Sequence, residues 1–155
     1  MDIRALTPTL SVGGQITAAD VRTLADLGIR SILCNRPNGE EPGQPGFAEI
    51  VEAARAAGIE TRHLPISGPP SDEDAADFGT ALDGLPKPVF AYCRSGQRSV
   101  TAWALSQAKR RSVADILAAA GAAGYDIGPA IPRIAATGRL QAGAMRASGD
   151  RAAAC

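Results

Sequence analysis

The chain of 155 residues has a mass of 15.8 kDa, which suits one domain with a hydrophobic core and is too small for two. Its 16 Lys and Arg residues balance its 16 Asp and Glu residues, so the formal net charge is zero. A neutral chain lacks the field that attracts a nucleic acid or an anionic membrane surface, and we expect neither as a partner. No apolar run approaches the roughly 20 residues that span a bilayer. Residues Met1 to Arg4 do not resemble the start of a secretory signal, so we expect a cytoplasmic protein.

The few cysteine and histidine residues restrict the chemistry further. Cys34, Cys93 and Cys155 lie far apart and are odd in number, which argues for a reducing compartment and against a disulfide framework. The single histidine, His63, is too little for a hydrolytic zinc site, and we expect a partly buried, hydrogen-bonded residue rather than a catalyst. We therefore expect no metal and no organic cofactor. The chemistry then depends on thiol, carboxylate, guanidinium or backbone amide groups.

The first half of the chain alternates short apolar runs with helical segments. It predicts, in chain order, a strand at 10–13, a helix at 18–27, a strand at 29–34, a loop at 35–39, a helix at 47–57 and a strand at 59–66. Thr17, followed by Asp20, is placed to cap the first helix, and Gly28 and Gly58 are placed to end the two helices.

The second half continues the alternation. It predicts a break at 67–70, a helix from 71 to about 85, a strand at 89–92, helices at 100–109 and 112–120, and a last helical stretch at about 129–145. Ser71, followed by Asp74, predicts a second cap, and Ser112 a third. The residues 147–155 predict a flexible tail. The whole pattern indicates the α/β class, with a small mostly parallel central sheet, helices on both faces and a single domain at 1–146.

The segment Cys93–Ser99, CRSGQRS, is the strongest candidate for an active site. It joins the buried strand at 89–92 to the next helix, and ligands of α/β sheets bind beyond the carboxyl ends of the strands. A compact loop here would turn backbone N–H groups toward the Cys93 sulfur, and the helix N-terminus together with Arg98 would favour the thiolate. We predict catalytic roles for Cys93 and Arg98, and substrate-binding roles for Arg94, Ser95, Gly96, Gln97 and Ser99. The alternative is a buried cysteine followed by a solvated basic turn.

Two resemblances support an enzyme. The loop at 93–99 resembles the active-site loop of rhodanese-type sulfurtransferases. The segments LSVGGQIT at 10–17, SILCNRP at 31–37 and the residues 88–99 resemble the beta-lactamase hydrolase-like protein, phosphatase-like domain family over about residues 3 to 140. That family is similar in fold to the cysteine-dependent tyrosine and dual-specificity phosphatases. It also occurs fused to persulfide dioxygenase domains of metallo-β-lactamase type, which implies a link to sulfide metabolism and a persulfide dioxygenase as a candidate partner.

The loop departs from the phosphatase pattern in three respects. Four residues separate Cys93 from Arg98 where the phosphatases have five, and Tyr92 stands where they have a histidine. The loop Ile66–Pro70 lacks the carboxylate that they use as a general acid, and the acids at 72–74 match the first turn of a helix. A smaller ring would hold the three equatorial oxygens of a phosphoryl group poorly, but it would accommodate one additional sulfur.

We therefore expect a cysteine-dependent sulfurtransferase. A Cys93 persulfide would carry sulfur from a small sulfur-containing anion such as thiosulfate, or from a thiol persulfide, to an acceptor thiol, sulfite or cyanide. One alternative is a tyrosine- or dual-specificity-like phosphatase, a phosphomonoester hydrolase with Cys93 as the nucleophile. A third hypothesis is a non-catalytic module that binds anions or senses oxidants through its thiol.

Two residues near the end of the strand at 29–34 are candidates for supporting roles. Cys34 could resolve the persulfide or could simply fill the core, and we favour the core. Arg36 could face the pocket or lie along the surface. The neighbouring charge run, Glu40 and Glu41, is expected to belong to a solvated face.

Overall fold

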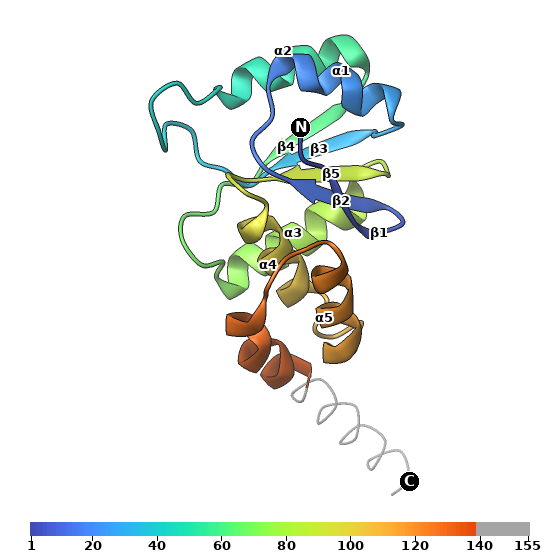
Figure 1. The fold of residues 1–155 in the computed structure, drawn as a ribbon, viewed down its shortest axis with the longest axis vertical. Helices are drawn as coiled ribbons and strands as arrows, with labels where there is room; N and C mark the ends of the chain where they lie inside the picture. The colour runs from blue at the N-terminus through green and yellow to red at the C-terminus, as the bar shows by residue number, and fades with distance from the viewer. Residues whose placement is uncertain (139–155) are drawn as a thin grey trace, which may run out of the picture.

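A five-stranded sheet forms the middle layer of the molecule (Figure 1). In this computed structural model, which describes residues 1–138, the strands are β1 (Arg4–Thr7), β2 (Leu10–Gly13), β3 (Ser31–Cys34), β4 (Glu60–His63) and β5 (Val89–Tyr92). Their order across the sheet is β1-β2-β5-β3-β4, and every neighbouring pair is parallel except β1 with β2. The predicted mostly parallel sheet is therefore confirmed.

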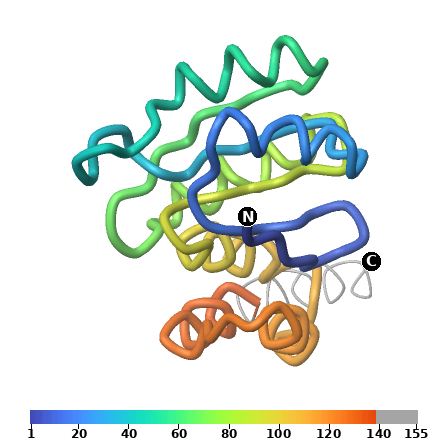
Figure 2. Tube along the Cα trace, turned by 45° about the horizontal axis from the view of Figure 1, so that its top comes forward, coloured from blue at the N-terminus to red at the C-terminus, as the bar shows by residue number. Residues whose placement is uncertain are grey.

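Helices cover both faces of the sheet, as predicted. They are α1 (Ala18–Asp26), α2 (Phe47–Ala57), α3 (Asp72–Gly84), α4 (Gln97–Ser106) and α5 (Val113–Ala122), followed by the short 3-10 helix η1 (Gly128–Ala130) and helical residues 131–138. Helices α1 and α2 lie together on one face, whereas α3, α4 and α5 lie on the other (Figures 1 and 2). None of the helices within residues 1–138 is long and apolar enough to cross a membrane.

The central strands are buried on both sides because their side chains alternate between two apolar clusters. On β5, Phe90 and Tyr92 pack with α1 and α2, whereas Val89 and Ala91 pack with the helices of the opposite face. Fully burying one such large apolar side chain contributes about 1.5–3 kcal/mol, so both helical layers hold the strand ends firmly. These strand ends carry the candidate site.

The predicted caps are confirmed, and some predicted boundaries move. Thr17 and Ser71 each form a capping box with the acid three residues on, and the Ser112 hydroxyl accepts from the backbone of Asp115. Helix α4 begins at Gln97 rather than Val100, because Gly96 turns the chain at a φ of 99° directly into the helix. The strands expected at 29–34 and 59–66 are shorter than predicted and occupy 31–34 and 60–63.

Strand β1 is an element that the sequence pattern did not predict. Its residues Arg4–Thr7 are mostly exposed, so they show no apolar run, and pairing with β2 alone makes them a strand. The last helical stretch, expected at 129–145, is observed through residue 138. Its remainder, the predicted tail at 147–155 and Cys155 lie outside the described residues.

We expect Ser71→Ala to lower the free energy of unfolding by about 1 kcal/mol, because the Ser71 hydroxyl accepts the Asp74 backbone N–H at 3.0 Å and so caps α3. Urea denaturation followed by circular dichroism measures this change. Ser67→Ala is the matched control, since Ser67 is exposed and precedes the helix without capping it. Equal stability of the two variants would contradict the assignment of the cap.

Candidate active site

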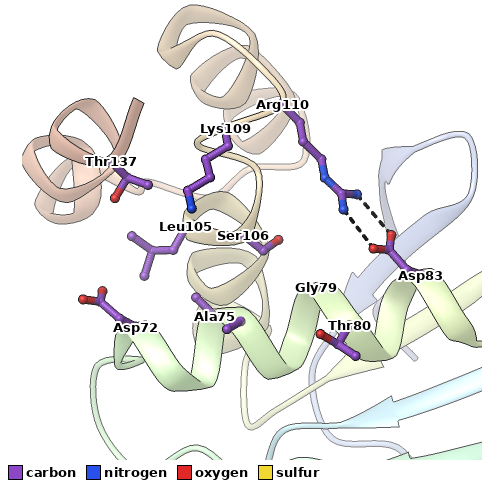
Figure 3. A pocket seen from close by; sticks show the side chains of 11 residues that line it. Asp72, Ala75, Gly79, Thr80, Asp83, Leu105, Ser106, Lys109, Arg110 and Thr137 are labelled. Carbon is purple, nitrogen blue, oxygen red and sulfur yellow. Dashed lines mark hydrogen bonds and ion pairs between the residues drawn. The ribbon is translucent and has the colours of Figure 1, made fainter. Parts of the chain in front are cut away.

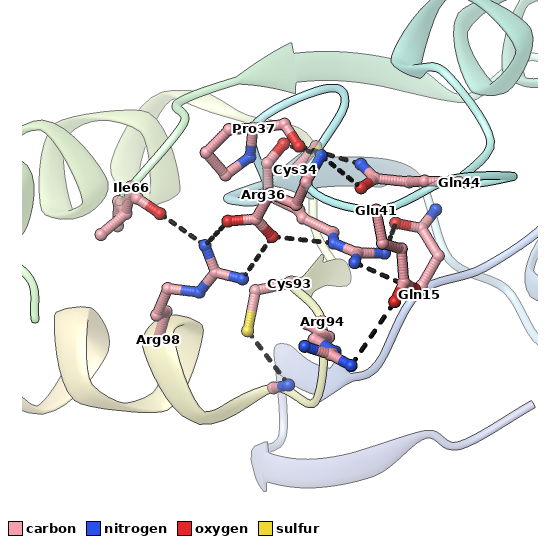
Figure 4. Close-up of polar contacts among 12 residues, drawn as sticks. Gln15, Cys34, Arg36, Pro37, Glu41, Gln44, Ile66, Cys93, Arg94 and Arg98 are labelled. Atoms are coloured by element: carbon pink, nitrogen blue, oxygen red, sulfur yellow. Dashed lines mark hydrogen bonds and ion pairs between the residues drawn. The ribbon is translucent and has the colours of Figure 1, made fainter. Parts of the chain in front are cut away.

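The site lies where the carboxyl ends of three parallel strands meet. Gly13 of β2 and Cys34 of β3 both pair with Tyr92 of β5, so the loops that follow these strands start side by side. These loops bring Gln15, Arg36 and Cys93 into one cluster, although they are far apart in the sequence (Figure 4). Strand register therefore decides which side chains surround the thiol.

The Cys93 side chain is buried beneath a tight loop. Its Sγ accepts a hydrogen bond from the backbone N–H of Gly96 at 3.1 Å, in the orientation that the sequence predicts. Gly96 is required here for two reasons: its φ of 99° is left-handed, and a Cβ at this position would collide with the Tyr125 hydroxyl. That hydroxyl donates to the carbonyl oxygen of Ser95 at 3.0 Å. The segment before η1 thus supports the loop from outside, a contact that sequence reasoning missed.

A second loop approaches from the β2 side. The backbone N–H of Gln15 donates to the Arg94 carbonyl at 3.3 Å, and a Cβ on Gly14 would come within 2.8 Å of the same oxygen. Gly14 therefore permits this approach of the two backbones. It is a local reason for the glycine pair that precedes Gln15 in the sequence.

Arg98 lies in the first turn of α4, with its guanidinium held from two sides. Nη1 donates to the Ile66 carbonyl at 2.7 Å, and Nη1 and Nη2 each donate to the Glu40 carboxylate at 2.8 Å (Figure 4). The hydrogen bond with Glu40 is the main cause that raises the pKa of Arg98; Cys93 adds to it, whereas partial burial opposes it. Two hydrogen bonds to Glu40 and one to the Ile66 carbonyl therefore fix the Arg98 guanidinium.

Glu40 is a solvent-accessible counter-ion of the site that the sequence did not identify. Its Oε1 also accepts Arg36 Nε at 2.9 Å, so one carboxylate joins two guanidinium groups. Hydrogen bonding from Arg98, and then from Arg36, lowers the pKa of Glu40 to about 2 despite an opposing effect of burial. Glu40 and Glu41 are both exposed, as expected for a solvated face, but the loop after β3 also brings their carboxylates onto the arginines of the site. The signal available beforehand was the presence of two acids shortly after a central strand.

Arg36 faces the site, which decides between its two predicted placements. Its side chain is only 1 % exposed, and Nη1 donates to the Gln15 side-chain oxygen at 3.2 Å. His63 lies behind it, with Nε2 at 2.9 Å from the Arg36 carbonyl and its ring stacked on Phe47. The prediction of a partly buried, hydrogen-bonded histidine is thus confirmed.

Cys34 and Tyr92 belong to the core beside the site. The Cys34 thiol donates to the Arg36 carbonyl with its Sγ at 3.4 Å, and burial raises the pKa of Cys34. Burial also raises the pKa of Tyr92, which packs on Phe90. Both groups therefore stay protonated at neutral pH, and Cys34 occupies the core position that we favoured.

The other predicted substrate-binding residues divide into rim and core. Arg94, Ser95 and Gln97 are exposed at the rim, where the Gln97 side chain donates to the Asp126 carbonyl at 2.8 Å. Ser99 is fully buried, and its hydroxyl donates to Asn35 Oδ1 at 2.8 Å. Because this hydroxyl is committed to Asn35, we no longer place Ser99 among the groups that face a substrate.

A cavity of about 290 Å³ opens beside Arg98. Its mostly apolar wall consists of Gly68, Pro69, Pro70, Gln97, Arg98, Thr101 and Pro129. A larger cavity of about 420 Å³ lies between α3 and α4 and contains the ion pair of Arg110 with Asp83 (Figure 3). The larger cavity lies at the end of α4 that is far from Cys93, and this helix is about 15 Å long. We therefore assign the smaller cavity to the site. Within residues 1–138, no three His, Cys, Asp or Glu side chains are grouped to hold a metal ion.

A parallel sheet whose central strand leads into a cysteine–arginine loop is the architecture of the cysteine-based phosphatases, and the chain has this phosphatase-like fold. PTPMT1 superposes with a TM-score of 0.69 at 16% identity, covering 95% of this chain and 99% of that one. Kinase associated phosphatase, with a catalytic-site cysteine replaced by serine, gives 0.63 at 17%, covering 86% and 87%. The nma1982 protein of Neisseria meningitidis Z2491 is more similar, with 0.79 at 34%, covering 87% and 97%.

The chain belongs to the family described as beta-lactamase hydrolase-like protein, phosphatase-like domain, whose profile matches residues 2–110. The beta-lactamase hydrolase-like protein of Agrobacterium fabrum is 41% identical over 100 residues, which are 64% of this chain and 23% of that protein. The Xylella fastidiosa Temecula1 protein of the same name is 34% identical over 134 residues, or 84% and 31%. The chain thus spans about a quarter to a third of these curated relatives. The predicted family and cysteine-phosphatase-like fold are confirmed, whereas the comparisons give sulfur transfer no support.

We expect Glu40→Gln to lower the free energy of unfolding at pH 7 and to flatten its pH dependence in acid. The folded-state pKa of Glu40 is about 2, below its ordinary value of 4.5. The ion pair therefore stabilises the fold fully above pH 4.5, and this contribution is lost as the pH falls toward 2. Urea denaturation at a series of pH values measures the slope.

The control for this variant is Glu73→Gln, which removes an exposed carboxylate from the first turn of α3. Parallel stability curves for the wild type and Glu40→Gln across the acid range would contradict the role assigned to Glu40.

Proposed function

We propose that the protein is a cysteine-dependent phosphomonoester hydrolase with Cys93 as its nucleophile. The observation that carries this proposal is the Cys93 sulfur held under the Gly96 amide at 3.1 Å, with Arg98 in the first turn of the helix that follows this loop (Figure 4). A phosphoryl group needs both a nucleophile and fixed donors for its oxygens, and these groups supply them. The short loop, Tyr92 in place of a histidine and the missing general acid placed this hypothesis second to sulfur transfer in the sequence analysis. Family membership and the phosphatase-like fold now favour it.

The reaction would proceed by double displacement. The Cys93 thiolate attacks phosphorus, a sulfur–phosphorus bond forms, and the bond from phosphorus to the leaving oxygen breaks. The leaving oxygen takes a proton from solvent. Water then attacks phosphorus, the sulfur–phosphorus bond breaks, and inorganic phosphate leaves while the thiolate is regenerated. Arg98 and the backbone amides of the loop at Ser95–Gln97 would hold the equatorial oxygens.

The leaving group is the main constraint on the substrate. With a pKa of about 2, Glu40 carries no proton to donate at neutral pH. Asp72 pairs with Arg133 at 2.6 Å, and Asp74 is engaged in the capping box of α3. The apolar cavity beside Arg98 suits a ring. These features favour aryl phosphates, whose oxygens leave without protonation, over alkyl phosphates.

We expect the wild-type protein to hydrolyse p-nitrophenyl phosphate and Cys93→Ser to lose this activity. Arg98→Lys should lower kcat/KM by about 100-fold, because the lysine ammonium cannot form the two parallel hydrogen bonds that a guanidinium donates. Initial rates of phenolate release measure both effects. Arg110→Lys is the matched control, since Arg110 binds Asp83 in the same two-pronged manner at the far end of α4.

Retained hydrolysis in Cys93→Ser would contradict the proposal. A wild-type protein that binds phosphate but releases no phenolate would indicate the non-catalytic anion-binding or thiol-sensing module instead.

Sulfur transfer is the second candidate function, because only four residues separate Cys93 from Arg98. In this reaction the Cys93 thiolate would take the outer sulfur of thiosulfate, releasing sulfite, and cyanide would remove that sulfur as thiocyanate. A persulfide dioxygenase remains a proposed partner on the basis of family resemblance.

We expect no thiocyanate above the level of Cys93→Ser when the wild type is incubated with thiosulfate and cyanide. Mass spectrometry after treatment with a persulfide donor reports whether Cys93 gains one sulfur atom. Thiocyanate production without phenolate release from p-nitrophenyl phosphate would replace the hydrolase assignment with sulfur transfer.

A further inference from the structure

A second group of positive charges lies next to Cys93 and is not used by the proposed reaction. The Glu41 carboxylate bridges two arginines: its Oε1 is 3.2 Å from Arg36 Nη2, and its Oε2 is 3.4 Å from Arg94 Nη2 (Figure 4). Arg94 directly follows Cys93 in the chain. The position of the Glu41 carboxylate therefore shows that the guanidinium groups of Arg36 and Arg94 are close enough to bind one anion together.

Arg36 is incompletely satisfied at this place. The side chain is 1 % exposed; Nε donates to Glu40 and Nη1 to Gln15. Nη2 is near Glu41 but out of line for a hydrogen bond, and it is the buried side-chain nitrogen without a partner among the described residues. An unsatisfied buried donor, especially a charged one, is costly, so Nη2 favours an anion that can align with it.

The resident carboxylate can be displaced. The side chain of Glu41 is 44% exposed and that of Arg94 is 69% exposed, so their ion pair is a weak surface contact. The cluster holds the guanidinium groups of Arg36, Arg94 and Arg98 against the carboxylates of Glu40 and Glu41. When Glu41 moves away, two positive charges are in excess over Glu40. The cluster then attracts further negative charge.

We infer that Arg36 and Arg94 form a second anion subsite, which takes a carboxylate or phosphate group that the substrate carries in addition to the phosphate held at Cys93. The inference rests on the proposed function, because it names the class of phosphomonoester that the site selects. Glu41 occupies the subsite in the resting protein and gives way to the substrate's anionic group. The preferred substrates are therefore aryl phosphates with a second negative charge.

The test compares carboxyphenyl phosphate with carbamoylphenyl phosphate, which have the same shape but differ by one charge. The three ring isomers of each compound sample the separation between the two anionic groups. For the best isomer we expect kcat/KM to be about tenfold higher for the carboxylate, as one additional charge-assisted contact would give. Arg94→Gln should abolish this ratio, whereas Glu41→Gln should increase it.

Arg94 is exposed, so the fold does not depend on its side chain, and Arg22→Gln on α1 is the matched control that should retain the wild-type ratio. Hydrolysis of both compounds at equal rates by the wild type, for every isomer, would overturn the subsite and leave the hydrolase standing.

A binding measurement separates the subsite from catalysis. Calorimetry with Cys93→Ser measures the dissociation constants of both compounds without turnover. Tighter binding of the carboxylate, lost in a variant that combines Cys93→Ser with Arg94→Gln, would support the subsite even if the wild type proves inactive. Equal dissociation constants would overturn it.

Discussion

The site depends on one carboxylate, that of Glu40, which accepts hydrogen bonds from two guanidinium groups. Arg98 on α4 and Arg36 in the loop after β3 approach each other near Cys93, and without a counter-ion their charges would repel at a partly desolvated edge. Glu40 binds Arg98 through two parallel hydrogen bonds, which fix the plane of the guanidinium as well as its position. The low pKa of Glu40, about 2, keeps this charge in place.

This arrangement also bears on how the site would bind the anionic substrate proposed for it. Glu40 and Glu41 hold the positive charges of the site while no substrate is bound, and the two carboxylates differ in how tightly they are held. Glu40 is 29% exposed and bonded to two arginines, whereas Glu41 is 44% exposed and makes only long contacts. In the proposed reaction, a substrate anion would therefore displace Glu41 more readily than Glu40, and Glu40 would continue to hold Arg98 in place.

Most of the fold was predictable from local patterns. The caps at Thr17 and Ser71, the bounds of α2 and the strands at 10–13 and 89–92 follow from interactions within a few residues, which a sequence displays directly. Strand β1 was not predictable, because only its pairing with β2 makes it a strand. The start of α4 was misplaced, because a glycine that turns the chain into a helix looks like any loop glycine.

The sequence by itself determined the family and the class of fold, and it located the loop of the proposed nucleophile, since Cys93, Gly96 and Arg98 lie within one short segment. Only the tertiary structure decided that Arg36 faces the site and that Glu40 reaches Arg98, which is 58 positions away. Sulfur transfer was favoured by the short spacing of Cys93 and Arg98, by Tyr92 and by the missing acid at 66–70, and these are local features that leave out the groups contributed by other loops. Ion pairs between loops depend on the parallel register of β2, β5 and β3, and no local pattern encodes that register.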